Sequence, residues 1–180
     1  LINDGLIETK VIKKGKDYLE CKAINAGTIK TGNGVNIPTG SISQPAITKK
    51  DKEDAIFAIS QEVDWIALSF VRHADDLKEL QALIEAHSEY KIPIIAKIEK
   101  PEAVENIDKI VAYCDGLMVA RGDLGVEVPA QEVPLIQKEL VLTAKRARIP
   151  VIIATQMMET MITSLTPTRA EVNDVANSVM

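Results

Sequence analysis

The chain has 180 residues, of which 46% are hydrophobic and 26% are charged, and its formal net charge is −5. This composition is ordinary for a globular protein, and without a basic face or an aromatic-rich basic patch we expect no nucleic-acid partner. No apolar run reaches the roughly 18 residues of a membrane span, so we expect no membrane partner. The two cysteines, Cys21 and Cys114, fit no metal or redox spacing and indicate a reduced, cytoplasmic protein.

The first 35 residues differ in pattern from the rest. Two β-like runs separated by a glycine-containing turn predict a hairpin, and a third run with its own turn predicts another short strand. These runs cover residues 6–11, 18–24 and 27–34. We interpret 1–35 as part of a small antiparallel β domain. The proline- and glycine-containing stretch 36–50 predicts an extended linker.

From residue 51 onward, predicted helices and strands alternate. The predicted strands are 64–71, 92–98, 115–120 and 150–154, and the predicted helices are 51–62, 74–87, 101–112, 131–148 and 168–180. Such alternation predicts a parallel sheet with right-handed crossovers. A complete eight-stranded barrel needs about 250 residues, so this stretch is either a small open sheet or part of a barrel. The first residue is Leu1 and the last helix has no C-cap signal, so we expect a piece of a longer protein and favour the partial barrel.

The predicted strand 92–98 ends in a lysine and a carboxylate. Side chains two positions apart share a face of a strand, so Lys97 and Glu99 are predicted to point the same way, opposite to Ala96 and Ile98. The carboxyl ends of parallel strands are where α/β folds place their chemistry. The alternative is an ion pair that frays into solvent.

Each of the other predicted strands is also followed by polar residues. They are Ser69 and Arg72 after the first strand, Arg121, Gly122, Asp123 and Gly125 after the third, and Thr155 and Gln156 after the fourth. A single such residue is usually a cap or a surface group. Four consecutive strand ends that do this are poorly explained by capping alone, so the pattern indicates a site.

These residue types favour a hard cation and an anionic substrate. Glu99 and Asp123 follow neighbouring strands, and two nearby carboxylates repel unless a cation or a proton lies between them. Mg²⁺ typically takes one or two carboxylates with substrate oxygens and waters. Lys97 would stabilise a developing oxyanion or a moving phosphoryl group, and Gly122 would allow backbone N–H groups to approach an anion. Neither histidine has partners at zinc-site spacing.

Several blocks of the sequence resemble the pyruvate kinase family. The blocks IIAKIEKPEAV, MVARGDLGVEVP, IIATQMMETM and TPTRAEVNDVAN match hallmark stretches in the family's order, with weaker matches at LINDGLI, GNGVNIP and LSFVR. The resemblance covers essentially the whole chain. It implies an α/β fold that is a partial TIM (β/α)8 barrel, strands three to six, with the remnant of a small inserted β-barrel domain. Residues 1–35 would be the C-terminal part of the inserted domain, and 36–180 the central part of the catalytic barrel.

The resemblance also implies roles for individual residues. Lys97 would be catalytic, stabilising the transition state of phosphoryl transfer, and Thr155 would contact substrate and help to protonate the enolate. Glu99 and Asp123 would bind Mg²⁺, and the backbone of Gly122 and Asp123 would hold the carboxylate of phosphoenolpyruvate or pyruvate. The family moves a phosphoryl group from phosphoenolpyruvate to ADP, giving pyruvate and ATP in glycolysis. It also usually uses K⁺, whose ligands lie outside this chain, and the complete enzyme would be a homotetramer.

Two positions depart from the family pattern. Asn33 stands where the family commonly has a nucleotide-contacting lysine, and Asn3 stands where an acidic residue is more usual. Two other readings also fit the residues: a Mg²⁺-dependent lyase barrel acting on pyruvate enolates, and a non-catalytic piece. Nucleotide-dependent phosphoryl transfer separates the first from a kinase. We expect the isolated 180 residues to be inactive, because half of a barrel wall holds catalytic groups too loosely.

Overall fold

A computed structural model describes residues 1–38 and 45–180 of the chain. The strands are β1 (Thr9–Lys14), β2 (Leu19–Ala23), β3 (Ile66–Leu68), β4 (Ile94–Ile98), β5 (Gly116–Ala120) and β6 (Val151–Ala154). The helices are α1 (Lys49–Ser60), α2 (Ala74–His87), α3 (Pro101–Glu105), α4 (Ile107–Ile110), α5 (Arg121–Glu127), α6 (Val133–Ala147) and α7 (Arg169–Val179). Two short 3₁₀ turns, η1 (Ala130–Glu132) and η2 (Glu159–Ile162), precede α6 and α7.

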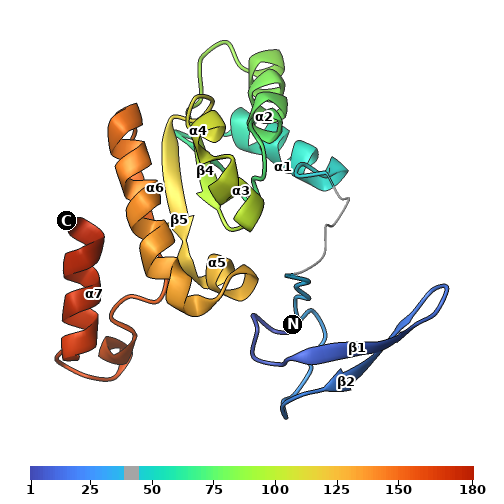
Figure 1. Ribbon diagram of the computed structural model, residues 1–180. Coiled ribbons are helices and arrows are strands. Elements are labelled where there is room, and N and C mark those ends of the chain that lie inside the picture. The colour runs from blue at the N-terminus through green and yellow to red at the C-terminus, as the bar shows by residue number, and fades with distance from the viewer. Residues whose placement is uncertain (39–44) are drawn as a thin grey trace.

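The described strands form two separate sheets. β1 and β2 pair antiparallel as a hairpin, and β3 to β6 form a parallel sheet in chain order, which confirms the predicted strand–helix alternation (Figure 1). We call residues 1–38 the N-terminal β segment. Its ends are joined by the bridge between Ile2 and Val35, and the hairpin projects away from this junction. The predicted domain boundary after residue 35 stays a prediction.

The parallel sheet has one face that is buried and one that is more open. The register aligns Ala96, Leu117 and Val151 in one row, and Lys97, Met118 and Ile152 in the next. Ala96 and Leu117 are fully buried, and α2 and α6 pack against the sheet. The side chains of the second row are partly exposed. This alternation is what a sheet covered on one face by crossover helices requires.

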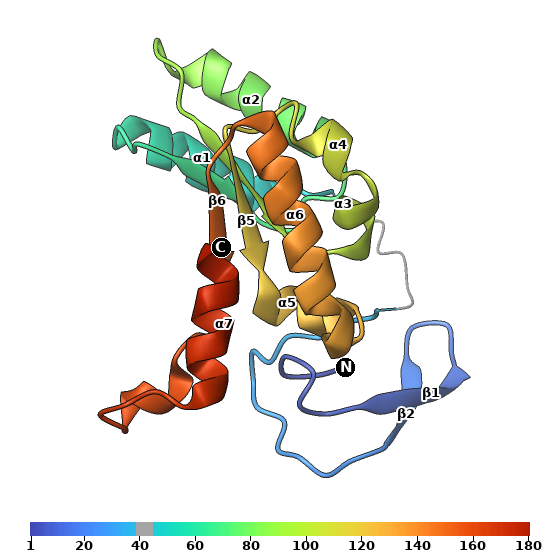
Figure 2. The same cartoon turned by 60° about the vertical axis from the view of Figure 1, so that its left-hand side comes forward.

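The hydrophobic core lies between the sheet and these helices. It includes Leu77 and Ile84 of α2, Ile98 of β4, Ile110 of α4, Val119 of β5 and Leu140 of α6. Figure 2 shows α6 lying along β5 and β6, with α7 standing beyond the edge of the sheet. Burial of these apolar side chains, each stabilising by about 1.5–3 kcal/mol, holds the sheet and its helices together.

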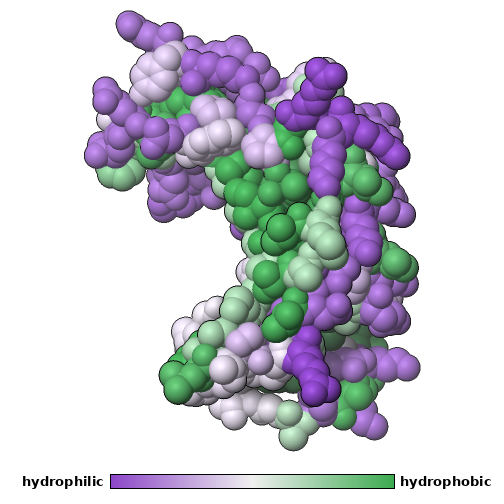
Figure 3. All heavy atoms as spheres, turned by 90° about the vertical axis from the view of Figure 1, so that its left-hand side faces the viewer, coloured by the Kyte–Doolittle hydropathy of each residue, from purple (hydrophilic) through white to green (hydrophobic). Residues whose placement is uncertain are grey.

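β6 is an edge strand, because among the described residues it pairs only with β5. Figure 3 views the side of the molecule that carries α6 and α7 and shows hydrophobic residues gathered along a hollow. The large apolar side chains exposed on β6 and α7 are Ile152, Val172 and Val179. In the described part of the chain, no helix is long and apolar enough to cross a membrane.

Four expectations about local structure are wrong. No strand forms at 27–34, where Gly32 has φ +85° and the Asn33 side chain accepts a hydrogen bond from the Lys30 N–H, so the chain turns instead. The single helix expected at 101–112 is broken at Asn106. The Asn106 side chain donates to the Glu102 carbonyl, which also accepts the Asn106 backbone N–H, so two donors share this carbonyl at the end of α3.

The third difference lies directly after β5, where α5 forms although the sequence predicts no helix between 120 and 131. The linker expected at 36–50 is also shorter than predicted, because Thr48 caps α1 in a reciprocal capping box with Asp51. Residues 39–44 of that linker lie outside the described residues.

Candidate functional site

The polar residues predicted to form a site lie at one edge of the parallel sheet. The register pairs Leu68 with Ala96, Ile98 with Val119, and Ala120 with Ala154, so the residues that follow these positions emerge at the same end. Ser69, Lys97, Glu99, the first turn of α5 and Thr155 are therefore neighbours through sheet register, although they are spread over almost 90 positions of sequence. This is the carboxyl edge, where parallel α/β sheets bind ligands.

Lys97 and Glu99 lie on the same face of β4, as the strand parity predicts. The Lys97 Nζ is 2.7 Å from Glu99 Oε1 and donates to Ser69 Oγ at 2.9 Å. The Lys97 side chain is 25% exposed, so its ammonium group remains accessible at the edge of the sheet. Two acceptors on different segments hold the ammonium in place, which is the preorganisation that a charge-stabilising group needs.

Glu99 is buried, with only 1% of its side chain exposed, so the interpretation of an ion pair fraying into solvent is wrong. Its second oxygen, Oε2, accepts a hydrogen bond of 2.6 Å from the Phe70 N–H. Phe70 has φ +54°, a left-handed conformation that is unusual for an aromatic residue. Burying a carboxylate is costly unless it is paired and hydrogen-bonded, and both conditions are met here.

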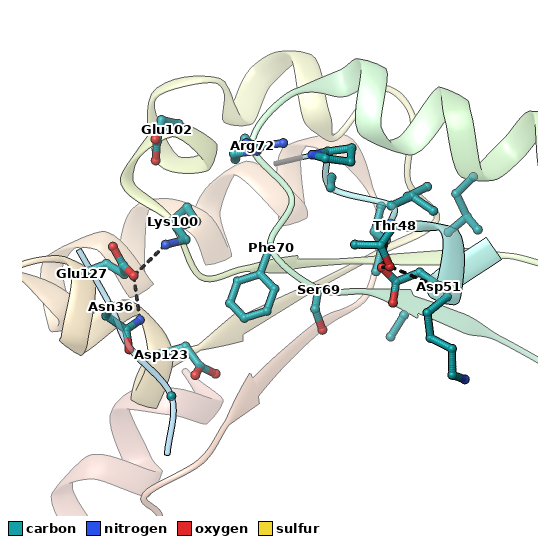
Figure 4. Close-up of a pocket in the computed structure, with 18 of the residues that line it drawn as sticks. Asn36, Thr48, Asp51, Ser69, Phe70, Arg72, Lys100, Glu102, Asp123 and Glu127 are labelled. Carbon is teal, nitrogen blue, oxygen red and sulfur yellow. Dashed lines mark hydrogen bonds and ion pairs between the residues drawn. The ribbon is translucent and has the colours of Figure 1, made fainter. Parts of the chain in front are cut away.

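Asp123 lies in the first turn of α5 and is exposed, in contrast to Glu99. In the part of the chain that the structure describes, no hydrogen bond or ion pair occupies its carboxylate, which faces the cavity shown in Figure 4. No group of three or more His, Cys, Asp or Glu side chains gathers around a common point within residues 1–38 and 45–180. A cation here would therefore have two protein carboxylates at most.

Thr155 contacts Gly122 directly. The Gly122 N–H donates to Thr155 Oγ1 at 3.0 Å, and a Cβ added to Gly122 would lie 3.1 Å from the same oxygen, so the close approach favours glycine. Thr155 has φ +72°, and the next residue, Gln156, has φ +55°. A β-branched residue in this region is strained, and such strain is concentrated at functional sites.

Arg121 holds the strained turn in position. Its guanidinium donates to the Thr155 carbonyl at 2.7 Å and makes a two-pronged contact with Asp174 of α7, at 2.5 and 3.0 Å. Bidentate arginine–carboxylate pairs fix geometry as well as charge. The pair therefore joins α7, the turn after β6 and the start of α5, and it supports the Thr155–Gly122 contact.

A cavity of about 1150 Å³ lies between the N-terminal β segment and the sheet. Asn36, Ser69, Phe70, Lys100, Asp123 and Glu127 are among its lining residues, and Figure 4 shows them arranged around it. Lys97, Glu99, Gly122 and Thr155 are not among the lining residues and sit at the edge of the sheet beside it. The cavity is large enough for a small ligand, and the predicted residues occupy its border rather than its centre.

Comparison with known proteins identifies the family. A family model described as "Pyruvate kinase, barrel domain" matches residues 1–180. The chain belongs to the pyruvate kinase family. Pyruvate kinase 2 of Synechocystis sp. is 50% identical over 182 residues, covering 100% of this chain and 31% of that protein. The pyruvate kinase of Bacillus licheniformis is 51% identical over 99% of this chain and 31% of its own length, and that of Clostridium perfringens is 46% identical over 99% and 38%. The chain thus spans about a third of the length of the curated relatives it matches.

Asn33 and Asn3, the two positions expected from the sequence to depart from the family pattern, contact each other. Asn33 Nδ2 donates to Asn3 Oδ1 at 2.7 Å, while Asn33 Oδ1 accepts from the Lys30 N–H. The contact is a neutral amide pair, and both polar atoms of the Asn33 side chain are used within the N-terminal β segment.

The donors present suit Mg²⁺ better than a softer metal. Glu99 and Asp123 supply carboxylate oxygens, and magnesium sites commonly use one or two carboxylates with waters and substrate oxygens. Cys114 is buried, burial raises the pKa of its thiol to about 11, and it precedes β5, at the opposite end of that strand from Asp123. The residues therefore fit a hard divalent cation.

Sequence reasoning missed three groups at this edge. It did not predict that Ser69 binds Lys97, that Arg121 and Asp174 hold Thr155, or that Lys100 pairs with Glu127 at 2.6 Å. The Ser69–Lys97 contact could have been predicted from the sheet register, because Ser69 is in line with Lys97. The other two contacts depend on α5, a helix that the sequence does not predict.

Proposed function

We propose that this chain is the central part of a pyruvate kinase that transfers the phosphoryl group of phosphoenolpyruvate to ADP, giving pyruvate and ATP. In this proposal residues 1–35 are the end of a small inserted β domain. Residues 36–180 are strands three to six of a (β/α)8 barrel in a cytoplasmic, homotetrameric glycolytic enzyme. The observation that supports it most is the Lys97–Glu99 arrangement beside Asp123 at the carboxyl edge of a parallel sheet, in a chain of this family.

Each residue then has a distinct role. Glu99 and Asp123 would hold Mg²⁺, which when bound neutralises charge on the phosphoryl oxygens. The Lys97 ammonium, held by Ser69, stabilises the charge on the phosphoryl group as its bond to the enol oxygen breaks and its bond to the ADP oxygen forms. The backbone at Gly122 and Asp123 orients the substrate carboxylate.

Thr155 would contact the enolate that remains and help to deliver a proton to its carbon, which completes pyruvate. In the described structure the Thr155 hydroxyl accepts the Gly122 N–H. Substrate binding at this backbone therefore requires the two groups to separate slightly or to share the ligand. K⁺, by family resemblance, would bind outside this chain. Because catalytic geometry tolerates little looseness, the isolated 180 residues should form no ATP above a Lys97→Met control.

A Mg²⁺ titration of the initial rate in the whole protein tests the metal assignment. Glu99→Gln keeps the side-chain shape but removes an anionic ligand, so it should raise the Mg²⁺ concentration needed for half-maximal rate by about 10- to 100-fold, with activity partly recovered at high metal. Glu79→Gln, on the exposed α2 ion pair with Lys52, is the matched control and should leave the curve unchanged. Identical curves for Glu99→Gln and the parent would remove Glu99 from the metal site.

A further inference from the structure

Helix α5 contacts both the candidate site and the N-terminal β segment. Its first turn contains Gly122 and Asp123, and its last turn contains Val126 and Glu127. Val126 packs against the N-terminal β segment, where a methyl group placed on Gly5 would lie 3.6 Å from both Val126 methyl carbons. A helix of seven residues is only about 10 Å long, so any shift at one end reaches the other.

Glu127 is buried among partners from two other parts of the chain. Only 4% of its side chain is exposed, and its Oε1 accepts from Lys100 Nζ at 2.6 Å and from Asn36 Nδ2 at 2.8 Å. Figure 4 shows Asn36 and Lys100 reaching this carboxylate from opposite segments beside the cavity. A buried carboxylate with two donors is strongly fixed, because losing Lys100 would leave its charge uncompensated and losing Asn36 would remove one of its hydrogen bonds.

The two partners connect Glu127 to the N-terminal β segment and to the loop that carries Glu99. Asn36 belongs to a stretch whose backbone is joined to the chain start, through Asn36 N–H to the Leu1 carbonyl at 2.9 Å and Asn3 N–H to the Gly34 carbonyl at 3.0 Å. Lys100 directly follows Glu99, and its ammonium lies 5.9 Å from the centre of the Phe70 ring. The Phe70 N–H in turn donates to Glu99.

We propose that Glu127 is a positioning residue that couples the N-terminal β segment to the Glu99–Asp123 pair. The Lys100–Glu127 ion pair fixes the loop that carries Glu99 relative to the helix that carries Asp123, and so sets the separation of the two carboxylates. The Asn36–Glu127 hydrogen bond fixes the N-terminal β segment over the same cavity. The expected effect of Glu127 on metal binding rests on the proposed function.

A purely structural ion pair makes a different prediction. It would lower thermal stability when broken, but cation affinity would change no more than for any other destabilising substitution. Coupling instead predicts that Asn36, which touches neither carboxylate of the metal pair, affects cation affinity through Glu127.

The test uses the whole protein and two measurements on the same variants. The first is hydrogen exchange of the amides at positions 3 and 36, which report the backbone junction of the N-terminal β segment. The second is Mn²⁺ affinity, measured from the electron paramagnetic resonance signal of free Mn²⁺, which prefers the same oxygen ligands as Mg²⁺. The variants are Glu127→Gln and Asn36→Ala, with Glu79→Gln as the control, since it removes an exposed ion pair between α1 and α2.

Glu127→Gln should weaken Mn²⁺ binding about tenfold, as the loss of an outer positioning group does in metal sites. Asn36→Ala leaves the Lys100–Glu127 ion pair intact, so no buried charge loses its counter-ion and the variant should fold. It should speed exchange at position 3 and weaken Mn²⁺ binding about threefold. Glu79→Gln should change neither measurement.

Unchanged exchange in Asn36→Ala overturns the contact with the N-terminal β segment. Mn²⁺ affinities equal to the parent in both variants overturn the coupling and leave the proposed function intact. If the unsubstituted protein binds no Mn²⁺, the proposed metal site is wrong. The exchange result then still shows whether the Asn36–Glu127 contact holds the N-terminal β segment.

Discussion

Two pairs of strands of nearly equal length differ completely in their surroundings. In the β1–β2 hairpin every residue is exposed except the half-buried Thr9, although Val11, Ile12 and Leu19 are large and apolar. In the β4–β5 pair no residue is exposed, and most are fully buried. The backbone pairing is regular in both cases, so the pairing alone does not explain why one pair belongs to a core.

The difference shows that the two regions are held by different forces. The sheet is held by apolar burial against α2 and α6, whereas the N-terminal β segment is held by contacts within itself and with α5. Within the segment, Ile7 is 4% exposed and Asn25 bonds to the backbone of Glu8 and Leu6, and toward α5 Asn36 reaches Glu127. An isolated hairpin is marginal in water, so these few contacts fix where the hairpin points.

The largest contrast is expected in the reactivity of the two cysteines. Cys21 is exposed in the hairpin, whereas Cys114 is buried next to β5, and burial raises its thiol pKa to about 11. At pH 8 only about one Cys114 thiol in a thousand is then a thiolate, the reactive form. Timed labelling with a maleimide, read by mass spectrometry, should modify Cys21 at least about a hundredfold faster. Comparable rates would mean that the sheet opens as readily as the hairpin.

Truncation of a leucine in each region should give the next largest contrast. Leu117 of β5 is fully buried, and Leu117→Ala should cost about 2–5 kcal/mol because it leaves a cavity. Leu19 of β2 is 52% exposed, and Leu19→Ala should cost no more than about 0.5 kcal/mol. Urea unfolding of the whole protein measures both. A large loss for Leu19→Ala would show that the hairpin is covered in the whole protein.

Sequence reasoning succeeded where a local rule controls the outcome. Strand parity placed Lys97 and Glu99 on one face, and the alternation of strands and helices predicted that β3 to β6 form a parallel sheet. It failed at α5, because two glycines in seven residues lower helix propensity and tertiary contacts override that preference.

It also failed for contacts between distant positions. Arg121 and Asp174 are 53 positions apart, and Asn36 and Glu127 are 91 apart. No pattern in the sequence predicts which charged or amide side chains meet across such distances. The geometry of Thr155 depends on the first of these contacts, so its strained backbone could not be predicted either.

The smallest effect is expected at the start of α7, which is exposed like the hairpin but is held by hydrogen bonds from side chains. Hydrogen bonds lower the pKa of Glu171 to about 2. The bond from the Thr160 hydroxyl contributes most, followed by those from the backbone N–H groups of Thr168 and Thr160. A depressed folded-state pKa contributes stability above the unfolded value near 4.5, and this stability is lost as pH falls toward 2.

The thermal midpoint of the parent should therefore exceed that of Glu171→Gln at pH 7. The gap should close progressively below about pH 4.5. Differential scanning calorimetry at pH 7, 4.5 and 3 measures this gap, with Glu79→Gln as an exposed control on α2. A gap that is constant with pH would mean that the Thr160–Glu171 bonds do not depend on the carboxylate charge.

The most direct test of the proposed chemistry is the rate of phosphoenolpyruvate-dependent ATP formation by the whole protein and by its Lys97→Met variant. Methionine keeps most of the side-chain volume but removes the ammonium that Ser69 and Glu99 hold. If Lys97 stabilises charge that develops during transfer, kcat should fall by about 10²- to 10³-fold while Mn²⁺ affinity stays close to that of the parent. A variant that forms ATP at the parental rate, or one that loses only thermal stability, would contradict a catalytic role for Lys97 and leave it as one half of a structural ion pair.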